Sequence, residues 1–313
     1  MQQTMQMFQN GDFAGRRVVF GIGVFDGVHR GHRILLETVC RMAAESSAVP
    51  AALTFAPHPR QILCPEQPPR LLTSLRGRMK LIKACGIEQV IVIPFTRELA
   101  NLPPMDFLNR LSSFQGELCG ICVGSNWRFG ARAAGGMAEL TEFAGSKGIR
   151  FEPVPELEWK GDTVSSTRIR RAIASGRLGE AEELLGRPYR LTGTVVHGYR
   201  AATGDLACPT ANLVPEEGIL PPDGVYAAKA FLPEGGEYWS AVNLGVSPTY
   251  RRPGGERRLE LHLLDYSGDL YGRELGVEFV RCLRPERAFP DTEALRQQIT
   301  QDIAEIRKLQ YGK

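Results

Sequence analysis

Residues 17–32 have the sequence RVVFGIGVFDGVHRGH, in which an apolar run leads directly into a glycine-rich segment with two histidines. The run 17–25 is rich in β-branched and aromatic residues, which predicts a buried strand. The following stretch, 33–45, has apolar residues at helical spacing and predicts a helix. The sequence therefore predicts a strand, a loop and a helix in succession, and the loop carries His29 and His32.

The same alternation of strand and helix continues through the first half of the chain. The expected strands are near-continuous apolar runs, which is the pattern of strands buried on both faces of a parallel sheet. We expect further strands at 51–55, 89–95, 117–124 and 149–157, and further helices at 75–86, 105–114 and 137–148. The first half is therefore predicted to be a three-layer α/β domain with an open parallel sheet.

The sequence pattern changes after two short helices, which we expect within 165–186 and divided at Gly176. Short strands separated by Gly/Pro turns follow, and this indicates an antiparallel β-barrel or sandwich. We expect these strands at 191–198, 224–232, 239–245, 258–266 and 276–283, and a C-terminal helix at 292–309. The 313 residues are thus predicted to form two domains, 1–186 and 187–313.

The composition argues against several classes of protein. Lys and Arg number 38 and Asp and Glu number 35, so the net charge of +3 predicts neither a nucleic-acid nor a membrane partner. No apolar run reaches the roughly 18 residues needed to span a bilayer, and the polar N-terminus does not resemble a secretory signal. We expect a cytoplasmic protein with small-molecule substrates, and the sequence identifies no protein partner.

The seven cysteines are irregularly spaced and predict no disulfide framework. Cys119 and Cys122 have the CxxC spacing of a redox or zinc site. They lie in an apolar run, and no second CxxC or His pair accompanies them. We therefore interpret them as two thiols of a buried strand.

The loop at 23–32 combines features that suit phosphate binding. It follows a strand of the predicted parallel sheet, and ligands of such sheets bind at the carboxyl ends of the strands. The next helix offers free backbone N–H groups and a positive dipole to an anion, and the glycines allow close approach of the backbone. His29 and His32 have no neighbours at zinc-ligand spacing, so we expect their imidazoles to donate hydrogen bonds to phosphoryl oxygens. The alternative is a pair of structural histidines in a turn.

These motifs carry a resemblance to a known family. FDGVHRGH (25–32) resembles the HxGH motif of the nucleotidyltransferase superfamily, and the whole chain resembles the bacterial bifunctional riboflavin kinase/FAD synthetase family. Further motifs of that family follow in order as TFAPHP (54–59), VGSNWRFG (123–130) and SSTRIR (165–170). The resemblance implies a Rossmann-like FMN adenylyltransferase domain followed by a riboflavin kinase barrel.

The resemblance also implies the binding residues of the first domain. ATP is expected to contact Gly23, Phe25, Asp26, Gly27, Gly31, Asn126, Ser165, Ser166, Thr167, Arg168 and Arg170, and the flavin to contact His58, Pro59 and Arg128. Within SSTRIR, hydroxyls at a helix start cap the helix and bind phosphate, and the two arginines can form bidentate contacts with phosphate oxygens. Taken alone, the segment would equally fit an ordinary capped basic helix.

The second half carries the segment CPTANL, which resembles the PTAN motif of riboflavin kinases. Thr210 and Asn212 are two apart on an extended segment, so their oxygens point to the same side, and such oxygens suit Mg²⁺ bound to ATP phosphates. Glu260 lies on the polar face of an alternating strand, and the resemblance implies that it is the general base for the riboflavin 5′-hydroxyl. The loop 198–208 departs from the family pattern, since Gly204 alone remains near its tip to contact ATP.

The resemblance implies that riboflavin is phosphorylated to FMN, which ATP then adenylylates to FAD with release of pyrophosphate. His29, His32 and Glu260 are the expected catalytic residues, and Mg²⁺ is expected to serve both sites. Two alternatives remain open. The altered loop 198–208 allows a monofunctional FAD synthetase with a non-catalytic, flavin-binding barrel. The HxGH motif itself also allows another phosphorylated acceptor, because it does not select one.

Overall fold

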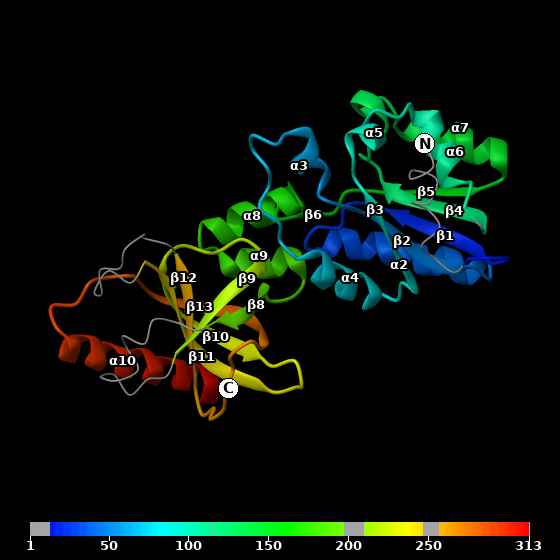
Figure 1. Cartoon of the computed structure of the whole chain (residues 1–313). Helices are drawn as coiled ribbons and strands as arrows, with labels where there is room; N and C mark the ends of the chain where they lie inside the picture. Colours follow the sequence, from blue (N-terminus) through cyan, green and yellow to red (C-terminus); the bar gives the residue numbers. More distant parts are fainter. Residues whose placement is uncertain (1–12, 115, 197–209, 247–256, 313) are drawn as a thin grey trace. The chain divides into compact units, whose positions relative to one another are not determined.

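The computed structural model describes residues 13–114, 116–196, 210–246 and 257–312 (Figure 1). The chain divides into two compact units, Met1–Ser166 and Thr167–Lys313. The expected fold classes are confirmed, because the first unit contains a parallel sheet and the second contains a closed antiparallel barrel. The boundary between functional domains after residue 186 stays a prediction.

The sheet of the first unit has five parallel strands in the order β3-β2-β1-β4-β5. These are β1 (Arg17–Ile22), β2 (Val49–Ala56), β3 (Gln89–Pro94), β4 (Glu117–Gly124) and β5 (Arg150–Val154). The chain runs outward from β1 to β3 and then returns to the other side of β1, so the strand order reverses between β1 and β4. In open sheets of this kind a ligand binds at the carboxyl ends of the strands that flank the reversal.

Helices cover both faces of this sheet. They are α2 (Arg30–Glu45), α4 (Leu75–Lys83), α5 (Arg97–Ala100), α6 (Pro104–Leu111) and α7 (Met137–Lys147), and the short α3 (Pro59–Leu63) contributes no buried residue. Alternate residues of β1 point to opposite faces: Phe20 shares a core with Leu108 of α6 and Phe143 of α7, whereas Val19 shares a second core with Leu36 of α2. Burial on both faces explains why the strands are continuous apolar runs in the sequence.

The last strand of the sheet is shorter than the expected 149–157, because β5 ends at Val154. Val154 is the register partner of Gly124, where the neighbouring strand β4 also ends, so among the described residues no further partner on β4 is present beyond this point. A short hairpin comes next, formed by β6 (Glu158–Trp159) and β7 (Asp162–Thr163). The Arg30 guanidinium carbon lies 4.4 Å from the centroid of the Trp159 ring, which fixes the hairpin beside the first turn of α2.

The second unit contains a closed barrel with the strand order β10-β11-β12-β9-β8-β13 (Figure 1). Its elements are α8 (Ser166–Ala174), α9 (Leu178–Leu185), β8 (Arg190–Val196), β9 (Ala211–Glu217), β10 (Gly224–Phe231), β11 (Glu237–Gly245), β12 (Arg258–Leu263), β13 (Glu274–Pro285) and α10 (Thr292–Tyr311). The expected division of α8 from α9 at Gly176 is confirmed, and this glycine has a φ of +77°. The sequence did not predict β9, because its second half contains Pro215 and two glutamates in place of an apolar alternation.

Leucines fill the barrel interior, and α10 closes part of its outer surface. On β12, Leu259, Leu261 and Leu263 are buried, and Glu260 and His262 alternate with them on the opposite face. Ile306 of α10 packs in a cluster with Ala227 and Leu264. The barrel core is therefore separated from a polar outer row on β12.

A buried ion pair holds α10 to the barrel. The Arg284 guanidinium on β13 donates to both carboxylate oxygens of Asp302, with distances of 2.9 Å to 3.2 Å. Gln298, one turn earlier on α10, also donates to Asp302 at 2.9 Å. Three donor groups thus satisfy a carboxylate that is 6% exposed.

Candidate active sites

The loop between β1 and α2 has an unusual backbone. Phe25 and Val28 have φ angles of +55° and +40°, and Gly27 lies between them with a φ of +80°. Left-handed conformations are costly for residues with a Cβ, most of all for a β-branched valine, so surrounding contacts must hold the loop in place. The ring of Phe25 lies under Gly23, where an added Cβ would approach the ring to 3.0 Å.

Asp26 supplies several of those contacts. Its buried carboxylate accepts hydrogen bonds from the backbone N–H groups of Leu72 at 3.0 Å and Thr73 at 3.2 Å. The Thr73 hydroxyl accepts from the N–H of Gly27 at 3.2 Å, and the Ser166 hydroxyl donates to the Asp26 carbonyl at 2.9 Å. The structure therefore places the Asp26 carboxylate against the protein's own backbone.

His29 and His32 lie together at the start of α2. His29 is the N-cap residue, and its Nδ1 accepts from the backbone N–H of His32 at 3.3 Å. An imidazole that accepts at Nδ1 carries its proton on Nε2 when neutral, so Nε2 of His29 is a donor. The two rings stack with centroids 3.6 Å apart, and Gly31 leaves room for the His29 ring. The structure thus brings together the pair that the HxGH motif predicted.

His32 has a buried ring nitrogen for which no partner is present in the described part of the chain. This atom is Nδ1. Burial lowers the pKa of His32 well below 6.5, and the neighbouring His29 and Arg78 lower it further. His32 is therefore neutral near pH 7, and its ring offers a polar atom to a ligand. The edge of the Phe25 ring packs against it with centroids 5.3 Å apart.

The TFAPHP segment places His58 at the N-cap of α3. Its Nδ1 accepts from the N–H of Arg60 at 3.1 Å, and its own N–H donates to Gln61 at 2.8 Å. Pro59 occupies the first helical position, where the absent N–H costs nothing. This capping box fixes the orientation of the His58 ring at the carboxyl end of β2.

The VGSNWRFG segment follows β4, the strand beside β1. Asn126 is exposed and donates to Glu156 at 2.5 Å. The rings of Trp127 and Phe129 stack with centroids 4.7 Å apart, which forms an aromatic wall. Arg128 lies over Gly136, where an added Cβ would approach a guanidinium nitrogen to 2.4 Å. Parallel pairing of β1 and β4 thus brings the VGSNWRFG motif to the same sheet edge as the histidines.

The SSTRIR segment spans the division between the compact units. Ser165 and Ser166 belong to the first unit, and Thr167, Arg168 and Arg170 belong to the second. Within the second unit, Arg168 donates to Glu180 of α9 at 3.1 Å, an ion pair that the sequence did not indicate. The phosphate contacts expected of these residues stay predictions.

The kinase motif residues lie in one row on the barrel. Asn212 of β9 is the register partner of Glu260 on β12, and Glu260 is the partner of Asn243 on β11. Directly opposed residues have Cβ atoms about 5 Å apart and side chains on the same face. The Asn212 side-chain oxygen is buried, and no partner for it is present among the described residues. The row therefore contains a buried acceptor whose hydrogen-bonding or metal-binding capacity a ligand can satisfy.

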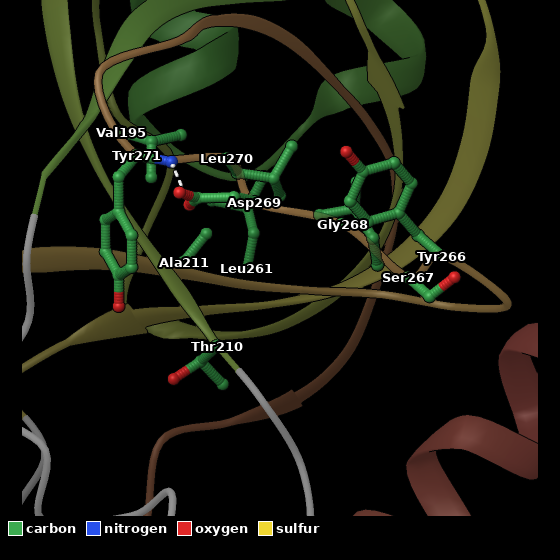
Figure 2. Close-up of a pocket in the computed structure, with 11 residues that line it drawn as sticks. Val195, Thr210, Ala211, Leu261, Tyr266, Ser267, Gly268, Asp269, Leu270 and Tyr271 are labelled. Atoms are coloured by element: carbon green, nitrogen blue, oxygen red, sulfur yellow. Dashed lines mark hydrogen bonds between the residues drawn. The ribbon is translucent and has the colours of Figure 1, made fainter.

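A cavity of about 310 Å³ begins beside Thr210, immediately before β9 (Figure 2). Apolar side chains of the barrel interior and two tyrosines line it together with polar groups of the segment after β12. The lining residues are Val195, Thr210, Ala211, Leu261, Leu263, Tyr266, Ser267, Gly268, Asp269, Leu270 and Tyr271. Gly204, the expected ATP-binding glycine, lies outside the described residues.

Sequence reasoning missed two residues of the first site, Thr73 and Arg78. Arg78 of α4 is 2% exposed, and its guanidinium donates to the Val24 carbonyl at 2.6 Å and to the Phe55 carbonyl at 3.2 Å. A charge within a helix pattern is usually solvated, so its burial had no sequence signal. By contrast, Cys119 and Cys122 are buried in β4, as expected.

Two known families match the chain. The FAD synthetase family matches residues 14–168, and the riboflavin kinase family matches residues 185–310. The bifunctional riboflavin kinase/FMN adenylyltransferase of Pseudomonas fluorescens is 36% identical and covers 94% of this chain and 93% of its own length. The proteins of the same name from Escherichia coli K12 and Listeria monocytogenes are each 32% identical and cover 91% and 92% of this chain, and 90% and 91% of their own lengths.

A solved structure described as a macrolide-efflux protein from Streptococcus pneumoniae has a TM-score of 0.81 and 26% identity. The match covers 95% of this chain and 96% of the chain in that structure. In the described part of the chain, no helix is long and apolar enough to cross a membrane. An FAD synthetase domain and a riboflavin kinase domain are both present, so the monofunctional alternative is not favoured. The expected family is confirmed, and the chain belongs to the bifunctional riboflavin kinase/FMN adenylyltransferase family.

Proposed function

We propose that this enzyme transfers the adenylyl group of ATP to FMN at the loop between β1 and α2. An oxygen of the FMN phosphate attacks the α-phosphorus of ATP and forms a new P–O bond. The bond from the α-phosphorus to the oxygen that bridges the α- and β-phosphates breaks, and pyrophosphate leaves with that oxygen and the electron pair. Charge develops on the phosphoryl oxygens during this step, so fixed hydrogen-bond donors contribute strongly to the rate. The observation that carries the proposal is the unpartnered, buried Nδ1 of His32 beside the stacked ring of His29.

We assign the remaining contacts from the family motifs that the sequence carries. Gly23, Gly27 and Gly31 let phosphates approach the backbone at the N-terminus of α2. Ser165, Ser166, Thr167, Arg168 and Arg170 are assigned to the polyphosphate, Asn126 to the nucleotide, and His58, Pro59 and Arg128 to the flavin. Phe25 and Asp26 are assigned to the ATP site through the loop that they stabilise, because the Asp26 carboxylate is engaged by Leu72 and Thr73.

We propose that the row on the barrel phosphorylates riboflavin. Glu260 accepts the proton of the riboflavin 5′-hydroxyl as that oxygen attacks the γ-phosphorus of ATP, and ADP leaves. Asn212 and Thr210 would hold Mg²⁺, and the buried unpartnered oxygen of Asn212 fits such a ligand. Bound Mg²⁺ neutralises negative charge on the ATP phosphates.

One assay tests both sites. The full chain is incubated with riboflavin, ATP and Mg²⁺, and riboflavin, FMN and FAD are separated and quantified over time. The proposal expects FMN to appear first and FAD to follow. A second reaction starts from FMN. Formation of FAD in the second reaction with neither FMN nor FAD in the first would contradict the kinase assignment, and failure of FMN as acceptor would contradict the adenylyltransferase assignment. We place this chemistry in the cytoplasm, with small molecules rather than nucleic acids as ligands.

A further inference from the structure

Arg78 is among the largest fully buried side chains of the molecule, and the activities above do not explain why it is charged. It lies on α4, whose N-cap Ser74 accepts from the N–H of Gly77 at 3.2 Å. A buried guanidinium is costly unless its donors are satisfied, so a residue of this kind in a core needs a specific reason. An apolar residue of similar length would otherwise fill the same volume.

The hydrogen bonds of Arg78 join the ends of two strands. One arm donates to the carbonyl of Val24, which directly follows β1, and the other donates to Phe55, near the end of β2. The Val24 carbonyl also accepts from the Thr54 hydroxyl at 2.9 Å. The planar fork of an arginine holds two carbonyls at a fixed separation, which an ammonium group does not do. Arg78 thereby fixes the backbone from which the histidine loop departs.

We propose that Arg78 is a positioning residue of the adenylyltransferase site, which fixes the ends of β1 and β2 and places a buried positive charge at the start of the loop that carries the histidine pair. The inference rests on the proposed role of His29 and His32 in that site. Arg78 touches no reacting atom in this proposal. It acts through the loop geometry and through its charge.

The charge has a consequence for His32. Within the described residues, the titratable groups that shift the pKa of His32 are His29 and Arg78, and both act in the same direction as burial. A nearby positive charge disfavours the imidazolium form, so the ring stays neutral and presents an acceptor and a donor rather than two donors. When a triphosphate brings negative charge to the loop, the same physics raises the pKa of His32. The proposal therefore couples nucleotide binding to proton uptake by this ring.

Three variants separate the geometry from the charge. Arg78→Met removes both, Arg78→Lys keeps the charge and loses the fork, and Lys80→Met removes an exposed charge from the same helix as a matched control. Riboflavin kinase activity in the same chain reports that each variant is correctly quantified, and circular dichroism with denaturant unfolding of the first unit reports whether that unit is folded. The His32 ring is titrated by NMR without substrates, and a His32→Gln variant assigns its signal among the five histidines.

We expect Arg78→Met to lower kcat/KM for FAD formation about tenfold or more and to raise the titration midpoint of His32. Arg78→Lys should slow FAD formation and keep the low midpoint, and Lys80→Met should match the wild type. An unmoved midpoint in Arg78→Met overturns the proposal, whatever the rate. If Arg78→Met does not fold, a wild-type rate in Arg78→Lys overturns it instead. The midpoint of the His32 titration does not depend on turnover, so it tests Arg78 separately from catalysis. The proposed catalytic role of His32 is tested separately by the rate of FAD formation in His32→Ala.

Discussion

Asn212 and Glu260 face each other across β9 and β12 as register partners, and they come from segments 48 residues apart in the numbering. Asn212 has a buried oxygen without a partner among the described residues, and Glu260 presents a carboxylate on the same face of the barrel. The proposed cation ligand and the proposed base are thus held on neighbouring strands. Since closed barrels are rigid, this spacing is set before either substrate binds.

Glu260→Gln should abolish riboflavin kinase activity and leave adenylyl transfer near normal. The amide keeps the size of the side chain but cannot accept the hydroxyl proton, so a loss of kcat of about 100-fold or more is expected. FMN formation is measured from riboflavin, and FAD formation is measured from supplied FMN. Glu237→Gln on the neighbouring β11 is the control, because that carboxylate is exposed and pairs with Lys229. A kinase rate near the wild type would disprove the role of Glu260 as a base.

His29→Ala and His32→Ala should each abolish FAD formation while FMN formation continues. Either substitution removes a ring from the stacked pair at the start of α2, and with it a polar group for the phosphoryl oxygens. A drop of about 100-fold or more in the rate from FMN and ATP is expected. The kinase activity of the same preparation is the control. Loss of both activities would contradict the independence of the two sites.

Asp26→Asn should weaken the adenylyltransferase site through the loop. The new amide group would face the N–H groups of Leu72 and Thr73, so about 1–3 kcal/mol of stabilisation is expected to be lost. The unfolding transition of the first unit in a chemical denaturant measures this loss of stability. The KM for ATP should rise in the same variant. Asp106→Asn, on the exposed side of α6, is the control. A higher KM for ATP with no loss of stability would instead indicate direct contact between Asp26 and the nucleotide.

Asp302→Ala should destabilise the barrel unit. The substitution leaves Arg284 partly buried without its carboxylate, and removal of one partner of such a pair costs about 3–5 kcal/mol. The kinase should lose activity at a lower denaturant concentration. Glu293→Ala breaks a pair with Arg296 that is exposed on the same helix, and it should cost less than about 1 kcal/mol. Equal losses of stability in the two variants would show that burial of the Asp302 pair does not add to the stability of the barrel unit.

The thiol of Cys122 should not react with alkylating reagents in the folded protein. Burial raises its pKa to about 12, so at pH 8 only about one molecule in ten thousand carries the thiolate. Cys64 and Cys282 are exposed and should be alkylated in the folded protein under the same conditions. Mass spectrometry of tryptic peptides identifies the labelled sites, and unfolding in urea should make Cys122 reactive. Rapid labelling of Cys122 in the native state would contradict its burial in β4.

Local patterns in the sequence predicted most of the first unit. Residues 17–45 form the expected strand, loop and helix, because an apolar run and a helical repeat each follow from burial on known faces. The error at β5 has a non-local cause, since β5 ends where its partner strand β4 ends at Gly124, and apolar content alone does not indicate that point. The HxGH pattern also predicted which side chains meet, because N-cap geometry brings residues three apart together.

Long-range contacts could not be predicted in the same way. The carboxylate of Asp26 meets Leu72 across 46 residues, and no pattern at either position indicates the pairing. The burial of Arg78 depends likewise on where α4 docks. On the barrel, alternation indicated the polar face of β12, but the pairing of Glu260 with Asn212 depends on the register of β9, a strand that the sequence did not predict.

The left-handed conformations of Phe25 and Val28 have one more consequence. A loop that is held in a costly shape by Asp26 and its partners is already ordered when the enzyme is empty. At the proposed phosphate site, substrate capture then requires little loss of chain entropy, so more of the interaction energy with the phosphates is available for affinity. Glycine at either position would relieve the backbone strain and make the loop less ordered. We then expect a more stable loop conformation but weaker binding of the nucleotide.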